Sequence, residues 1–174
     1  MAMGQFGSRL SGESVSPRLL KKEILEGEFL ELLEKKNLRE LREKLKELNE
    51  ADIAEFIDGL DSEKSLITFR LLPKDLATDV FACLEPDRQE HLIKSMTDKE
   101  LSFIIEDLYV DDAVGMLEEL PSDLVDKVLA NATPATRKLI NEMLKYPDNS
   151  AGSIMTVEYI GLKKSMTVKE AFAY

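Results

Sequence analysis

Short apolar patterns at helical spacing fill most of the chain between Leu48 and Ala132. An acidic residue followed by a branched apolar residue recurs at Asp52-Ile53, Asp75-Leu76, Glu100-Leu101 and Asp123-Leu124, so that the apolar anchors lie 23, 25 and 23 residues apart. A second apolar group follows each anchor about one helical turn later. A period near 24 suits two short helices and two tight turns. The pattern therefore predicts a helical solenoid, whose units bury their apolar faces against their neighbours.

Helix boundaries are marked by capping residues and prolines. Capping boxes are expected where an Asn or Thr precedes an acid by three residues, at Asn37/Glu40, Asn49/Asp52 and Thr97/Glu100. Asp61 is expected to cap a further helix. Four prolines are expected to occupy the first position of a helix, where a missing N–H costs nothing: Pro73, Pro86, Pro121 and Pro134. The predicted helices are 19–34, 38–47, 50–59, 62–71, 74–83, 86–95, 98–108, 111–119, 122–131 and 134–145.

The two ends of the chain differ from this helical part. Residues 1–17 are rich in Gly and Ser without any period, which is typical of a tag or disordered leader. Residues 18–145 form the acidic solenoid. Residues 146–152 indicate a linker, residues 157–162 a β-strand, and Thr167 with Glu170 the start of another helix. Residues 146–174 are therefore expected to be a linker and the truncated start of a second domain.

The composition and net charge of the chain limit the ligands and the classes of function to be expected. The 174 residues are 44% hydrophobic and 33% charged, which fits a globular chain. A net charge of −11 argues against binding to nucleic acid or anionic membranes and favours cations as ligands. One cysteine allows neither an internal disulfide nor a cysteine-based zinc site, and a cytoplasmic setting is expected. No apolar run approaches the roughly 20 residues that span a bilayer.

Three acidic residues, at two places in the chain, are candidate metal ligands. Asp111 and Asp112 begin a predicted helix, where acids cap free N–H groups and oppose the helix dipole. A capping carboxylate keeps a free oxygen, so metal contact is compatible with that structural role. Asp79 lies inside a predicted helix, a poor place for Asp by propensity; a solvated helix face is the alternative explanation.

Other reactive side chains have structural explanations. His91 has no nucleophile nearby in a motif and is expected on a helix surface. Cys83 follows Val80 and precedes Leu84, so a buried, inert thiol is expected. The sequence has no phosphate-binding loop, nucleophile elbow or zinc spacing, and no set of catalytic groups can be assembled. We therefore expect a protein that is not an enzyme.

The residues from 146 to 171 carry a family resemblance. The pattern Tyr-x-x-x-Ser-Ala-Gly-x-Ile-Met-Thr over 146–156, followed by Thr-Val-x-Glu-Ala over 167–171, resembles the opening of a CBS domain. Together with the acidic solenoid, Leu-Leu-Pro-Lys at 71–74 and Tyr-Val-Asp-Asp at 109–112, it resembles the MgtE family of magnesium transporters. The resemblance covers roughly residues 19–174.

The resemblance implies an all-α fold: a right-handed superhelix of about ten short helices, then the truncated first strand and helix of a CBS domain. It implies a cytoplasmic Mg²⁺-sensing domain of a membrane protein. It further implies that bound Mg²⁺ draws the domain onto its CBS domains and favours a closed transmembrane pore, and that the full-length protein is a homodimer. By resemblance, Asp79 and Asp111 match acidic positions that meet Mg²⁺ at the interface with the CBS domains, and the backbone near Ser153 lies in the same region. Gly115 stands where the family pattern can carry another acid, which puts at least one metal site in doubt.

The physical basis of such a sensor follows from charge. Two acidic surfaces repel within the Debye length, about 8 Å at physiological ionic strength. Mg²⁺ can bridge them because it uses one or two carboxylates and keeps several waters. The leading hypothesis is thus a regulatory Mg²⁺-binding domain. The alternative is a protein-interaction adaptor that presents a concave solenoid surface and has no role in transport.

Overall fold

A computed structural model describes residues 17–147 and 149–173. The predicted leader therefore lies outside the described residues, except for Pro17. The chain divides into two compact units, residues 1–44 and residues 45–174.

The first unit contains a long helix followed by most of a short one. These are α1 (Pro17–Glu34) and α2 (Leu38–Leu45). Gly27 does not interrupt α1, although glycine in a helix interior costs about 1 kcal/mol relative to alanine. An ion pair of 2.9 Å joins Lys44 Nζ on α2 to Glu28 Oε1 on α1. Phe29 and Leu41 are buried.

Most of the second unit consists of eight short helices of nearly constant length. They are α3 (Glu50–Asp58), α4 (Ser62–Leu71), α5 (Lys74–Cys83), α6 (Pro86–Ser95), α7 (Asp98–Asp107), α8 (Val110–Glu119), α9 (Ser122–Asn131) and α10 (Pro134–Met143). From α4 to α10 every helix has 10 residues. Each begins 12 positions after the one before, so two helices give the period near 24 seen in the sequence.

From α4 onwards, two extended residues connect each helix to the next. The first residue of each connection has an apolar side chain and ends the helix: Leu72, Leu84, Met96, Leu108, Leu120 and Ala132. All but Leu120 are buried, so the connections contribute to the core. The second residue is the N-cap of the following helix. This regular connection reverses the chain every 12 residues.

The prediction for the prolines is confirmed at two positions and wrong at two. Pro86 and Pro134 are first helical residues. Pro73 and Pro121 instead occupy N-cap positions, with ψ of 153° and 146°. A fixed φ near −65° suits both places, because the N-cap residue is extended while its φ stays in the proline range.

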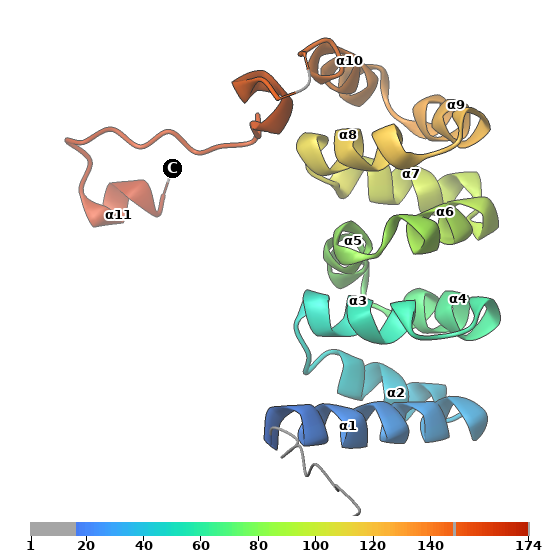
Figure 1. Ribbon diagram of the computed structural model, residues 1–174. Coiled ribbons are helices and arrows are strands. Elements are labelled where there is room, and N and C mark those ends of the chain that lie inside the picture. Colours follow the sequence, from blue (N-terminus) through green and yellow to red (C-terminus); the bar gives the residue numbers. More distant parts are fainter. Residues whose placement is uncertain (1–16, 148, 174) are drawn as a thin grey trace, which may run out of the picture. The chain divides into compact units, whose positions relative to one another are not determined.

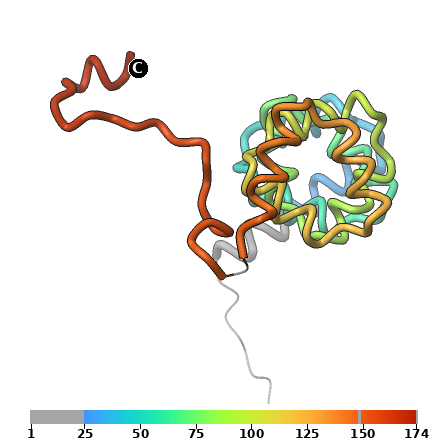
Figure 2. Tube along the Cα trace, turned by 90° about the horizontal axis from the view of Figure 1, so that it is seen from above, coloured from blue at the N-terminus to red at the C-terminus, as the bar shows by residue number. Residues whose placement is uncertain are grey.

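Alternate helices stack on one another. α3 packs on α5, α5 on α7 and α7 on α9, while α4 packs on α6, α6 on α8 and α8 on α10. Figure 2 shows the backbone of α3–α10 winding around a common axis. Three of the predicted anchors, Ile53, Leu101 and Leu124, are buried in α3, α7 and α9. The predicted solenoid is confirmed, and its repeating unit is the helix pair.

The solenoid core consists of branched aliphatic side chains and a few phenylalanines. Fully buried members from α3–α10 include Ile53, Ile57, Val80, Phe81, Leu92, Ile93, Leu101, Ile105 and Ile140. Phe69 and Phe81 meet edge to face, with ring centroids 6.1 Å apart. These layers hold the helix starts, which carry most of the acidic residues discussed below, in fixed positions.

The segment after α10 is only partly regular. It contains the 3-10 helix η1 (Ala151–Ile154) and the short helix α11 (Val168–Ala171), whose capping box at Thr167 and Glu170 confirms the prediction. The strand predicted at 157–162 is wrong, because the described residues contain no β-strand. Strand propensity needs a neighbouring strand to satisfy its backbone groups, and none lies beside this segment.

Within residues 17–147 and 149–173, no helix is both long and apolar enough to cross a lipid bilayer.

Candidate functional site

The first turn of α8 carries the two strongest sequence candidates. Asp111 and Asp112 both lie in that turn. The N-cap residue, Tyr109, gives no side-chain hydrogen bond to the helix. The free N–H groups at this helix end are thus left for groups from elsewhere.

Glu158 supplies the missing cap from 48 residues away. Its Oε1 accepts a hydrogen bond of 3.1 Å from the N–H of Val110. Its Oε2 accepts one of 3.2 Å from the hydroxyl of Thr156. A third carboxylate is thereby held beside Asp111 and Asp112.

Within the described residues, no lysine or arginine forms an ion pair with the carboxylates at this helix start. Asp111 is half-buried, and its Oδ1 is buried without a hydrogen-bond partner in the described part of the chain. Burial raises the pKa of Asp112, and the charges of Asp111 and Glu158 raise it further. The ionised form of Asp112 is therefore disfavoured here, and a cation arriving at this turn would relieve that cost.

Asp79 lies on the exposed face of α5, together with Cys83. The two residues are four positions apart, so they share a helix face. Cys83 is exposed, and the prediction of a buried thiol is wrong. The buried face of α5 contains Val80 and Phe81, and Cys83 follows Phe81 by two residues, about 200° around the helix.

The charges that act on Cys83 identify the acidic side chains near it. Partial shielding of the thiol raises its pKa most, and the charges of Glu50, Asp112 and Asp79 raise it further. These carboxylates come from α3, α8 and α5, and each lies near enough for its charge to act on the thiol. We call Glu50, Asp79, Asp111, Asp112 and Glu158 the acidic surface of the solenoid.

The acidic surface is not a complete metal cage. Within the described residues, no three Asp, Glu, His or Cys side chains are placed to hold one ion together. Carboxylate oxygens are nonetheless the donors that Mg²⁺ prefers, and Mg²⁺ binds through one or two of them while keeping waters. The arrangement suits an ion that bridges this surface to a second one.

The structure places Ser153 in a turn of its own. Its N–H donates to Ser150 Oγ at 3.2 Å, and its hydroxyl donates to the carbonyl oxygen of Ser150 at 2.9 Å. The aromatic ring of Tyr146 lies against Gly152, where a Cβ atom would clash with it. Ser153 therefore stabilises the turn from which the chain continues to Glu158.

The structure also shows the positions of two other residues singled out in the sequence, His91 and Gly115. His91 is half-buried, and its Nε2 lies 3.1 Å from the carbonyl oxygen of Ser62, a hydrogen bond between α6 and the start of α4. Gly115 lies on α8 four residues after Asp111, and a Cβ atom there would meet nothing within 4 Å. An acidic side chain at this position would fit without a clash.

Sequence reasoning missed Glu50 and Glu158. Glu50 was within a helix start whose cap is Asn49, and nothing local indicated its proximity to α5 and α8. Glu158 was expected in a β-strand. Both are brought to the acidic surface by contacts that link distant parts of the chain, for which a single sequence contains no direct signal.

Comparisons with known proteins agree on one family. The MgtE intracellular N domain matches residues 48–149, more than half of the chain. The magnesium transporter MgtE of Thermus thermophilus is 29% identical over 120 residues, which are 67% of this chain and 27% of that protein. This chain thus spans about a quarter of the length of that curated relative.

Two crystal structures have the same fold. The soluble part of a magnesium transporter superposes with a TM-score of 0.76 at 25% identity, over 87% of this chain and 60% of that one. The cytosolic domain of the Mg²⁺ channel MgtE, in complex with ATP, superposes with a TM-score of 0.72 at 29% identity, over 85% and 61% of the two chains. The acidic helical solenoid, the matched residues and these structural relatives together show that this chain belongs to the MgtE family, as its intracellular N domain.

Proposed function

We propose that this chain is the Mg²⁺-sensing regulatory domain of a membrane magnesium transporter, lying on the cytoplasmic side of the cell membrane. Mg²⁺ binds at Asp79, Asp111 and Asp112, with the backbone near Ser153 contributing, and joins the solenoid to the CBS domains of the same protein. The joined state favours a closed pore. The full-length protein is a homodimer, and residues 146–174 lead into the first CBS domain.

The observation that carries the proposal is the acidic surface. Carboxylates of α3, α5 and α8 all act electrostatically on the thiol of Cys83. The pKa of Asp112 is raised, and one buried oxygen of Asp111 has no hydrogen-bond partner within the described residues. Both observations indicate that ionised carboxylates are poorly stabilised at this surface. Structural acids are usually paired or hydrogen-bonded, so this set favours a role in binding a cation.

The incomplete coordination supports a bridging role. Since these carboxylates do not form a cage alone, strong binding requires further ligands from a second surface. Mg²⁺ affinity and domain docking are then linked, because an ion that binds only the docked state stabilises it by mass action. Membership of a magnesium transporter family favours this function over that of an adaptor.

Limited proteolysis of the full-length parent protein tests the proposal. Mg²⁺ is expected to protect the linker around residue 147, and protection is expected to saturate with concentration. The triple variant Asp79→Asn, Asp111→Asn, Asp112→Asn should need about tenfold more Mg²⁺ for half-protection, equal to about 1.4 kcal/mol of lost coupling.

A matched control removes the same charge elsewhere. The variant Glu119→Gln, Asp123→Asn, Asp126→Asn changes three exposed carboxylates near the end of α8 and on α9. It should keep the wild-type Mg²⁺ dependence. Equal shifts in both triple variants would mean that only net charge matters, and unchanged protection in the first would show that the wrong carboxylates were chosen.

A further inference from the structure

A groove on the solenoid has no part in the proposed metal function. It has a volume of about 910 Å³ and lies between α4, α5 and α7. Its apolar lining is Leu66, Phe69, Leu72, Ala77, Met96, Phe103 and Ile104. Pockets that hold small molecules usually measure about 300–1,000 Å³ and combine apolar walls with a few polar groups, and this groove fits both descriptions.

The carboxylates that line the groove already have partners. Glu100 accepts hydrogen bonds from Arg70 Nε at 3.0 Å and from the Thr97 N–H at 2.8 Å. Glu106 accepts from the Thr133 N–H at 2.7 Å and from the Thr136 hydroxyl at 2.9 Å. One oxygen of the remaining acid, Asp98, lies 3.5 Å from the side-chain amide of Asn131.

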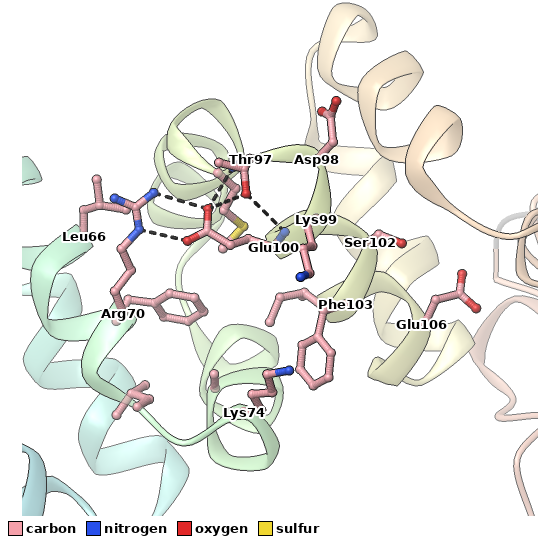
Figure 3. Close-up of a pocket in the computed structure, with 15 residues that line it drawn as sticks. Leu66, Arg70, Lys74, Thr97, Asp98, Lys99, Glu100, Ser102, Phe103 and Glu106 are labelled. Carbon is pink, nitrogen blue, oxygen red and sulfur yellow. Dashed lines mark hydrogen bonds and ion pairs between the residues drawn. The ribbon is translucent and has the colours of Figure 1, made fainter.

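Two lysines that line the groove differ from these acids. Neither Lys74 nor Lys99 forms an ion pair within the described residues. Lys74 Nζ lies 4.8 Å from the ring centroid of Phe103. Lys99 and Phe103 are four residues apart on α7 and so share a helix face. Figure 3 shows the Lys74 ammonium group beside the ring of Phe103, with Lys99 on the same side of α7.

We infer that this groove binds a free amphipathic organic anion. The anionic head group lies between Lys74 and Lys99, and an acyl or aromatic body covers Phe103 and the apolar lining. The chain carries a net charge of −11, so an anion is repelled from most of its surface. The groove combines lysines that form no ion pair within the described residues with apolar surface, and it includes none of Asp79, Asp111 and Asp112.

Calorimetric titration of the 174-residue chain with dodecanoate, kept below its micelle concentration, tests the inference. We expect saturable binding of one molecule per chain, with amide chemical shifts changing at Ser102 and Phe103. The variant Lys74→Gln, Lys99→Gln should weaken dodecanoate binding roughly tenfold, because both charge-assisted contacts are lost. In the same variant, the affinity for uncharged dodecanol should change less than twofold relative to the wild type.

The control variant Lys163→Gln, Lys164→Gln makes the same change of charge in the exposed segment before α11. It should bind dodecanoate like the wild type, and circular dichroism should show all variants folded. Three results would overturn the inference: no saturable binding of dodecanoate, equal weakening by both double variants, or binding to anionic phosphatidylglycerol vesicles without binding to the free anion. The last would identify a lipid surface instead.

Discussion

The first turns of α7 and α8 provide opposite environments for an acidic side chain. At the start of α7, the Thr97 N–H donates to Glu100, which also pairs with Arg70, and these contacts lower the pKa of Glu100. At the start of α8, no N-cap side chain bonds the helix, and burial with two neighbouring carboxylates raises the pKa of Asp112. The residue type and helical position are alike. Their partners differ. Ionised Glu100 therefore stabilises the fold, whereas ionised Asp112 is unfavourable in the absence of a cation.

The largest expected difference is in the free energy of unfolding, between variants of the two N-cap residues Thr97 and Tyr109. Replacing Thr97 with Ala removes a capping-box hydroxyl, and the free energy of unfolding should fall by about 1–2 kcal/mol. Tyr109→Ala at the corresponding position of α8 should change it by less than about 0.5 kcal/mol, since that exposed side chain caps nothing. Urea denaturation of the 174-residue chain measures both. Equal losses would mean that the two helix starts do not differ as described.

A smaller effect, of opposite sign at the two sites, is expected with pH. The lowered pKa of Glu100 means that its stabilisation is present above its ordinary pKa of 4.5 and is lost as pH falls through its folded-state value. The raised pKa of Asp112 means the reverse: stability is greatest below its ordinary value of 3.8 and is lost as pH rises through the folded-state value.

At pH 7 without Mg²⁺, Glu100→Gln should therefore destabilise the chain and Asp112→Asn should stabilise it. Each change is expected to be about 0.5 kcal/mol, because both side chains are partly exposed and solvent screens their charges. The Asp112→Asn difference should shrink towards pH 3.8, as measured by urea denaturation across pH. The same sign for both variants at pH 7 would contradict the comparison.

The smallest change in stability is expected at Gly115. Gly115→Asp adds a carboxylate one turn after Asp111, in open space. Replacing a helical glycine gains a few tenths of a kcal/mol, which the added repulsion largely offsets. The same variant should strengthen Mg²⁺ binding to the full-length parent protein severalfold, measured by the proteolysis midpoint.

Gly115→Asn is the matched control, with the same size and no charge. It should leave the Mg²⁺ midpoint unchanged. A strengthening equal to that of Gly115→Asp would assign the effect to helix propensity. No strengthening in either variant would show that the first turn of α8 is too far from the bound ion for position 115 to reach it.

Much of the fold could be predicted, because its boundaries are local. Asn49, Asp61, Thr97 and Thr167 cap helices as expected, since a capping side chain bonds an N–H only two or three residues away. The 12-residue spacing of Leu72, Leu84, Met96 and Leu108 is also present in the sequence. It was hidden in a two-helix period because the connecting residues resemble ordinary core positions.

The candidate site could be predicted only in part. Asp79, Asp111 and Asp112 were singled out as residues, but their use in binding Mg²⁺ stays a prediction. The exposure of Cys83 was missed because Val80 and Leu84 suggested an apolar face on both sides of it. The strand at 157–162 failed because propensity without a pairing strand does not form a sheet.

The sequence by itself determined approximately where the helices begin and end and that the chain is acidic, because caps, connections and net charge depend on neighbouring residues or on a sum. Only the tertiary structure decided which acids are satisfied. Arg70 meets Glu100 across 30 residues and Glu158 caps α8 across 48, while Asp79 and Asp112 approach the same cysteine from separate helices. A charge is stabilising or strained according to what lies within a few ångströms of it, and those neighbours are fixed by the stacking of α3–α10.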